Sequence, residues 1–218
     1  MKVQAHDVGQ YIEAIGRGGD KIRDYLVRSE IDRQIRIYKS KGYFNSEVST
    51  AVKRKFGVDV VLPLGFGIIK DTTNLLWICD AKGAVRRDIV IYSLPERPAA
   101  SIDKDFMLHA RDSVMRYTAS DGLDSSYMGT EYNYEPPVFA LVSRSDSVVC
   151  SELRGLWKMY NGRAMGGPFV CQMQHDACHS QVIAIEGFVF GPGQKKRTAL
   201  RQTEAIVNSL RCMPPRRE

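Results

Sequence analysis

The sequence predicts an α+β fold in which two N-terminal helices precede a mostly antiparallel sheet that carries two further helices. Helical apolar spacing fills the first 57 residues, short β-branched and aromatic runs follow from residue 58, and amphipathic segments occur near 101–117 and 195–211. The 218 residues can bury a core without metal or disulfides. With 44% hydrophobic and 26% charged residues, the composition excludes disordered, collagen-like, coiled-coil and membrane-spanning proteins.

The first segment predicts two helices. Ile12, Ile15, Ile22 and Leu26 recur at helical spacing, and a second apolar series lies at 31, 35 and 38. The glycine-rich stretch 16–19 is expected to break or kink this helix. A second helix is predicted over 45–56, with residue 45 or 46 as its N-cap and residue 57 as its glycine stop.

The middle and C-terminal parts predict strands separated by turns. Expected strands are Val58–Leu62, Gly65–Lys70, Leu75–Cys79, Asp88–Tyr92, then about 126–132, 137–143, 147–159, 167–177 and 181–190. Helices are predicted over about 101–117 and 195–211. Each helix follows a hairpin and a proline-containing loop. This order suggests two strand-strand-helix repeats with both helices on one sheet face, although coincidence explains the same order.

Residues 1–57 are thus interpreted as an N-terminal helical segment, 58–212 as the antiparallel α+β domain and 213–218 as a basic tail. The net charge is +6. Residues 193–218 hold seven basic and two acidic side chains, so they carry a net +5 of that total. This basic segment has no aromatic residue on which bases could stack, and we therefore expect no nucleic-acid binding.

The candidate catalytic and metal clusters are weak. Five cysteines, an odd number at irregular spacing, exclude a disulfide scaffold but leave any pairing open. Cys171, His175, Cys178 and His179 crowd into one predicted hairpin tip, so we expect no zinc site. Asp105, His109 and Ser113 share a helix face, but a serine in the middle of a helix lacks the strained turn and oxyanion donors of a nucleophile. No cofactor is predicted.

A candidate contact surface comprises six residues: Arg111, Arg154, Trp157, Lys195, Lys196 and Arg197. The last three lie before a predicted helix N-terminus, where cations and free amides suit an anion, or form a solvated loop. Arg154 and Trp157 lie near a glycine-rich strand corner, where they could stack or be half-buried.

Several segments resemble one family. They are Arg111–Val114, Ser126–Glu131, Arg154–Trp157, Met165–Val170, Glu186–Phe190 and Lys196–Ala205. Together they are similar to the domain-of-unknown-function family of envelope lipoproteins from Bacteroidetes bacteria. Members are longer, with a lipoprotein signal and an additional N-terminal half, so the chain resembles their C-terminal part. The resemblance implies a location in the cell envelope or periplasm, with an upstream lipid anchor as the membrane attachment.

These observations favour a non-enzymatic binding or structural module of a cell-envelope lipoprotein, which contacts an unknown envelope protein or ligand. The first seven residues contain no apolar stretch typical of a signal peptide. The alternative is a hydrolase or transferase whose site is completed by an N-terminal half. A large pocket that holds Asp112, His109 or Glu186 with a shifted pKa would favour the enzyme.

Overall fold

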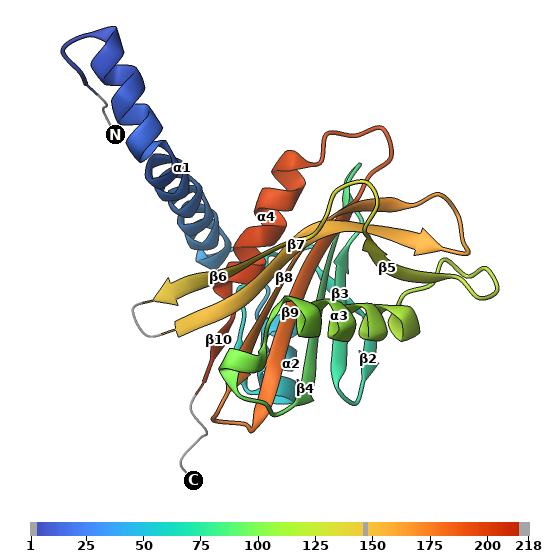
Figure 1. Cartoon of the computed structure of the whole chain (residues 1–218). Coiled ribbons are helices and arrows are strands. Elements are labelled where there is room, and N and C mark those ends of the chain that lie inside the picture. The colour runs from blue at the N-terminus through green and yellow to red at the C-terminus, as the bar shows by residue number, and fades with distance from the viewer. Residues whose placement is uncertain (1–3, 146–147, 214–218) are drawn as a thin grey trace.

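A computed structural model describes residues 4–145 and 148–213. The helices are α1 (Val8–Lys39), α2 (Ser46–Phe56), the 3-10 turn η1 (Ala99–Ser101), α3 (Lys104–Thr118) and α4 (Arg197–Ser209). The strands are β1 (Val58–Asp59), β2 (Gly67–Thr72), β3 (Leu75–Asp80), β4 (Arg86–Pro95), β5 (Tyr127–Glu131), β6 (Val138–Ser145), β7 (Val148–Tyr160), β8 (Gly166–Asp176), β9 (Gln181–Phe190) and β10 (Arg211–Cys212). The predicted α+β class and antiparallel sheet are confirmed (Figure 1).

Within the described residues, eight strands form one antiparallel sheet in the order β2-β3-β4-β9-β8-β7-β5, and β6 also pairs with β7. The long strand β7 has two partners along one edge. Its first half pairs with β6 and its second half with β5. The predicted strand Val58–Leu62 is shorter than expected, because only two of its residues pair with β10. Beyond them, the Val61 backbone N–H donates instead to the Ser209 hydroxyl at 2.9 Å.

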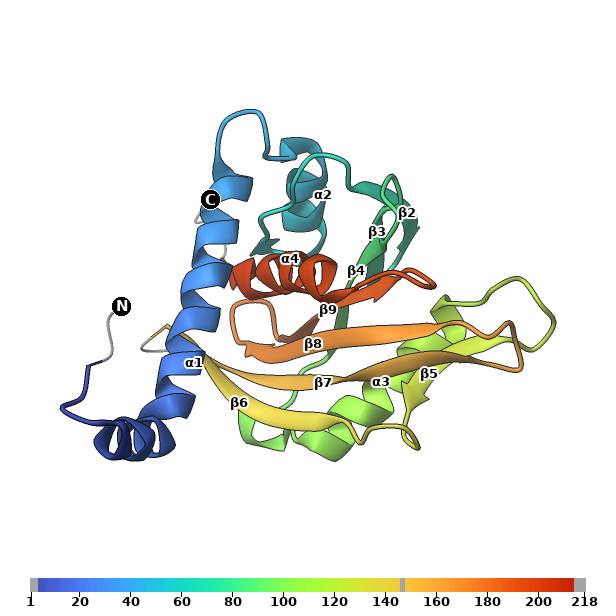
Figure 2. The ribbon, with the colours of Figure 1, turned by 90° about the horizontal axis from the view of Figure 1, so that it is seen from above.

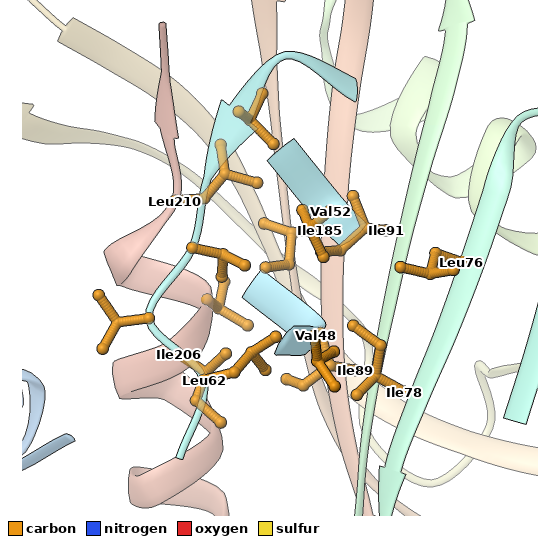
Figure 3. Packing of buried hydrophobic residues seen from close by; sticks show 14 of the residues in the cluster. Val48, Val52, Leu62, Leu76, Ile78, Ile89, Ile91, Ile185, Ile206 and Leu210 are labelled. Atoms are coloured by element: carbon orange, nitrogen blue, oxygen red, sulfur yellow. The ribbon is translucent and has the colours of Figure 1, made fainter. Parts of the chain in front are cut away.

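The central strands of the sheet, β4 and β9, are buried on both faces. On one face, α2 and α4 cover Leu76, Ile78, Ile89, Ile91 and Ile185, which Figure 3 shows between these helices and the strands. On the other face, α3 covers the neighbouring residues of the same strands, including Val90, Tyr92, Val182 and Ala184. Figure 2 shows α4 and α3 on opposite sides of the strands. Alternate side chains of β4 and β9 therefore enter two different cores.

The prediction of two helices on one face is therefore wrong. Strands β4 and β9 are antiparallel neighbours, with β3 and β8 on their outer sides. A β3-β4-α3 unit and a β8-β9-α4 unit whose helices lie on opposite faces have opposite handedness, so the two units do not superpose. The shared strand-loop-helix order is not a structural repeat.

Local signals place the helix ends. The Asp7 side chain accepts the Gln10 N–H at 2.8 Å at the start of α1, and Asp103 accepts the Phe106 N–H at 2.9 Å at the start of α3. Asn45 is the N-cap of α2, and Gly57 ends that helix in the left-handed region with φ 70°.

Helix α1 has two environments along its length. It is one continuous helix, and Figure 2 shows its first turns set at an angle to the rest, as the glycine-rich stretch predicts. Ile31, Ile35 and Tyr38 pack against the core beneath α4. The N-terminal half projects from the body, and its Val8 and Ile12 side chains are 74% and 65% exposed.

Candidate functional site

An open groove of about 510 Å³ runs along α3 beside strand β5. Its volume lies within the range of small-molecule sites. Its lining consists of His109, Asp112, Ser113, Arg116, Tyr117, Tyr127, Gly129 and Tyr160. The five lining residues of α3 recur at steps of three and four, so they share one face of that helix. Strand β5 and the end of β7 supply the other wall.

Asp112 fastens α3 to the edge of the sheet. Its Oδ1 accepts the Thr130 backbone N–H at 2.9 Å and the Thr130 hydroxyl at 2.7 Å, while its Oδ2 accepts the Tyr132 hydroxyl at 2.7 Å. The first of these bonds satisfies the Thr130 N–H, which the described strands leave without a partner on this edge of β5. Burial, the hydrogen bond to Asp112 and the charge of that carboxylate raise the pKa of Tyr132 to about 12.

Arg111 lies fully buried beneath this contact. Its Nε and Nη2 donate to the two carboxylate oxygens of Glu186 at 2.9 and 2.8 Å. Its Nη1 donates to Asp112 and to the Thr130 hydroxyl, both at 2.9 Å. The guanidinium carbon lies 3.9 Å from the centre of the Phe169 ring. Burial raises the pKa of Glu186 more than the attraction of Arg111 lowers it.

A stack of charged and aromatic groups forms the far wall of the groove. The Tyr127 and Tyr160 rings lie 5.2 Å apart at an angle of 9°. The Arg116 guanidinium lies 4.3 Å from the centre of the Tyr127 ring, and the Lys158 ammonium lies 4.6 Å from that of Tyr160. Gly129 leaves room for this stack, because a Cβ there would lie 2.9 Å from a Tyr160 ring carbon.

A second charge cluster occupies the opposite face of the sheet. Arg154 pairs with Glu204 and donates from Nε to Glu152 at 2.6 Å. Arg201 also donates to Glu204, at 2.7 Å, and Gln172 donates to Glu152 at 2.5 Å. The Arg154 side chain is 37% exposed, whereas Glu204 is 2% exposed. This cluster joins β7 and β8 to α4.

The structure divides the predicted contact surface. Arg154 lies on the same sheet face as α4, and Lys195 and Arg197 are exposed where that helix begins, with Lys196 half-buried. Their role as a surface stays a prediction. For Arg111 and Trp157 the prediction of a surface position is wrong. Arg111 lies on the side of α3 that packs against the sheet and is 0% exposed. Trp157, on the sheet face that α3 covers, is 2% exposed, and its Nε1 donates to the Val189 carbonyl at 3.3 Å.

The members of the metal-like cluster at residues 171–179 and of the triad-like set at 105, 109 and 113 have different partners or lie apart in the structure. His175 contacts Glu96 at 3.0 Å, and His179 contacts Asp176 at 2.8 Å. Cys171 lies buried beside the Tyr92 hydroxyl at 3.9 Å. The described residues contain no group of three or more His, Cys, Asp or Glu placed to hold a metal ion. His109 and Ser113 both line the groove, whereas Asp105 is not among its lining residues.

Arg116, Tyr127, Tyr160 and Lys158 are site residues to which the sequence pattern assigned no functional role. Arg116 falls four residues after Asp112, so its place on the same helix face is readable once helix α3 is predicted. Tyr127 and Tyr160 meet because β5 and β7 pair in a register that sets these two residues opposite each other. That register depends on the tertiary fold.

Comparisons with known proteins add a family and distant structural likenesses. The family described as "Domain of unknown function (DUF4837)" matches residues 45–209. No curated protein matches the chain. Among solved structures, a mutant of the protein Mog1 is similar with 8% identity and a TM-score of 0.44, over 73% of this chain and 92% of that one. The Ran-binding protein Mog1p of Saccharomyces cerevisiae gives 8% and 0.43, over 72% and 91%. No described helix is long and apolar enough to cross a membrane.

Proposed function

We propose that this chain, which belongs to the family of the domain of unknown function DUF4837 over residues 45–209, is a non-enzymatic module that binds a small molecule in the α3–β5 groove. One observation carries the proposal. The groove combines a tyrosine stack with a helix face of polar side chains, and a buried ion pair fixes that face against the sheet. Rigid support of this kind is what a binding site needs in order to recognise one ligand.

The same contacts argue against Asp112 and Glu186 as general bases. The groove contains His109 and Asp112, two of the residues that an enzyme would use. However, the two Asp112 oxygens accept hydrogen bonds from Arg111, Thr130 and Tyr132, and Glu186 lies under Arg111 outside the lining. A general base must have a lone pair that can reach the substrate proton. Asp112 is therefore a positioning residue in this proposal.

A groove-filling variant tests the proposal. Ser113 is exposed in the middle of the groove, so Ser113→Trp places an indole where the ligand would lie. The wild-type protein is mixed with a pool of small molecules extracted from cell envelopes and then examined by native mass spectrometry. We expect at least one retained mass that Ser113→Trp lacks and that the matched variant Lys104→Trp, at an exposed α3 position outside the groove, keeps. Identical spectra for all three proteins would contradict the proposal.

The proposed location is the cell envelope, where the module would belong to a lipoprotein. The motifs from Arg111 to Ala205 that resemble such proteins support this. Incorporation of labelled palmitate into the native gene product, recovered in the membrane fraction, is the expected result. Unlabelled protein in the cytosolic fraction alone would contradict the envelope assignment and leave the groove proposal untouched.

On the opposite face, Arg154, Lys195, Lys196 and Arg197 support a role in contacting a neighbouring envelope protein. Arg154 pairs with Glu204 of α4, and the other three residues lie at the start of that helix. One partner surface therefore could contact all four. Reversal of the charges of Lys195 and Arg197 to Glu should abolish cross-linking to such a neighbour in cells. Unchanged cross-linking would count against this surface.

A further inference from the structure

Arg116 differs from the other cations around the groove because it has no carboxylate partner. Arg111 pairs with Glu186 and Asp112, and Lys158 pairs with Glu131 at 2.6 Å. The Arg116 guanidinium contacts the Tyr127 ring, and within residues 4–145 and 148–213 it makes no ion pair or hydrogen bond. A groove wall thus carries one positive charge that the described chain does not neutralise.

The geometry of Arg116 leaves its donors available. The Arg116 guanidinium makes a cation–π contact with Tyr127, its carbon 4.3 Å from the ring centre, and none of its N–H groups donates to a described residue. The N–H groups of a guanidinium lie in its plane, where two of them match the two oxygens of a carboxylate or phosphate. The contact with Tyr127 restrains the Arg116 side chain, which reduces the side-chain entropy that binding would cost.

Neighbouring side chains supply further donors on the same face. Ser113 lies four residues after His109 and four before Tyr117, so these three share one face of α3 and line the groove together with Arg116. In the described part of the chain, their polar side-chain atoms make no hydrogen bond to protein. Two hydroxyls and an imidazole beside a fixed guanidinium are a donor-rich set, which suits an acceptor-rich anionic group better than a neutral one.

We infer that the ligand of the α3–β5 groove carries an oxyanion, a carboxylate or a phosphate monoester, which Arg116 binds. This inference rests on the proposed binding function and names the chemistry that the groove recognises. The tyrosine edges and Gly129 contact the remainder of the ligand. Charge-assisted hydrogen bonds are worth roughly 1.5–3 kcal/mol, so the anion should contribute about 10- to 100-fold in affinity.

Three probes of similar size test the inference: phenyl phosphate, benzoate and the neutral benzyl alcohol. Each is titrated at constant ionic strength into isotope-labelled protein while amide shifts of α3 and β5 are followed by NMR. We expect saturable shifts with at least one anion and about 10-fold or more weaker binding of benzyl alcohol. The stronger of the two anions identifies which oxyanion the groove prefers. Inorganic phosphate alone should compete weakly, because it lacks the ring that the groove also contacts.

Two matched variants locate the charge. Arg116→Gln should weaken anion binding about 10-fold or more. Arg97 also contacts an aromatic ring, with its guanidinium carbon 3.7 Å from the centre of the Phe106 ring, but it lies outside the groove lining. Arg97→Gln should therefore leave anion binding unchanged. Equal binding of benzyl alcohol and the anions, full binding by Arg116→Gln, or no shift with any probe would each overturn the inference. A ligand retained by wild type and lost in Ser113→Trp would keep the binding function even then.

Discussion

Arg111 and Arg154 lie on opposite faces of the sheet, and each contacts two carboxylates. They differ in how deeply they are buried and in whether their carboxylates have other hydrogen-bond donors. Arg111 and Glu186 are both 0% exposed, and their two hydrogen bonds form a bidentate pair that uses both oxygens of the carboxylate. Arg154 is 37% exposed, and its acidic partners also receive hydrogen bonds from Arg201 and Gln172. The number of alternative partners, more than the number of ion pairs, should decide how much each arginine matters to stability.

The largest expected effect is on the buried side. Arg111→Met should lower the free energy of unfolding by about 3–5 kcal/mol, because it leaves the Glu186 carboxylate buried without a partner. Urea denaturation measures this loss. Adding Glu186→Met should restore most of it, since the pair is then replaced by apolar groups of similar length. A loss below about 1 kcal/mol in the single variant would mean that water reaches Glu186.

The next effect probes packing on the α4 face. Gly187 follows Glu186 and faces α4, where a Cβ would lie 2.3 Å from the Thr203 Cγ2. Gly187→Ala should therefore cost roughly 1–3 kcal/mol in unfolding free energy through overpacking. Thr203→Ser removes that methyl group and keeps the hydroxyl that donates to the Ala199 carbonyl at 2.9 Å. The double variant should recover stability; if it does not, the clash involves Val207 or Ile89 instead.

Arg154→Met should cost less than Arg111→Met, roughly 1 kcal/mol, because its carboxylates keep other donors and its own side chain is partly in water. The loss should shrink further in 1 M salt, which screens partly exposed charges. Thermal melts at low and high salt provide the comparison. A cost equal to that of Arg111→Met would show that exposure does not distinguish the two clusters.

The smallest effect is a titration that reports on the Arg111 side alone. Burial, and then the hydrogen bond that its neutral hydroxyl donates to Asp112, raise the pKa of Tyr132 from 10.0 to about 12. The stabilisation is therefore present below pH 10.0 and is lost as the pH rises through about 12. Asp112→Asn should move this pKa back toward 10.0, whereas Arg154→Met should not. Carbon NMR of labelled tyrosine, with Tyr132→Phe for assignment, follows it.

Element positions were predictable because turn residues bound them. The strand predicted over 181–190 has those bounds, and helix 101–117 lies within three residues of α3 at its start and one at its end. The sheet faces that α3 and α4 cover were predicted wrongly. The run Ile89–Tyr92 is apolar without alternation, which is typical of a strand buried on both sides. This apolar run is consistent with a helix on each face of the sheet, whereas the shared strand-loop-helix order suggested that both helices cover the same face.

The site was predictable only in part, because its residues come together through strand register. Asp112 and His109 lie on one readable helix face. Tyr127 and Tyr160 are set opposite each other by the pairing of β5 with β7. Burial of Arg111 and Trp157 depends on which face α3 covers, and arginine or tryptophan in a motif gives no sign of that face. Charge and aromaticity alone therefore suggested a surface where the structure has an interior.

The unequal environments along α1 have a consequence for local unfolding. Its C-terminal half is held by Ile31, Ile35 and Tyr38, while its projecting half contains Gly9 and the glycine-rich stretch 16–19. Each glycine weakens a helix by about 1 kcal/mol relative to alanine. Amide protons of the projecting half should therefore exchange with solvent through fraying, and those near Tyr38 only through opening of the core. The exchange rates of successive amides along α1 would therefore show at which residue the cooperatively folded part of the chain begins.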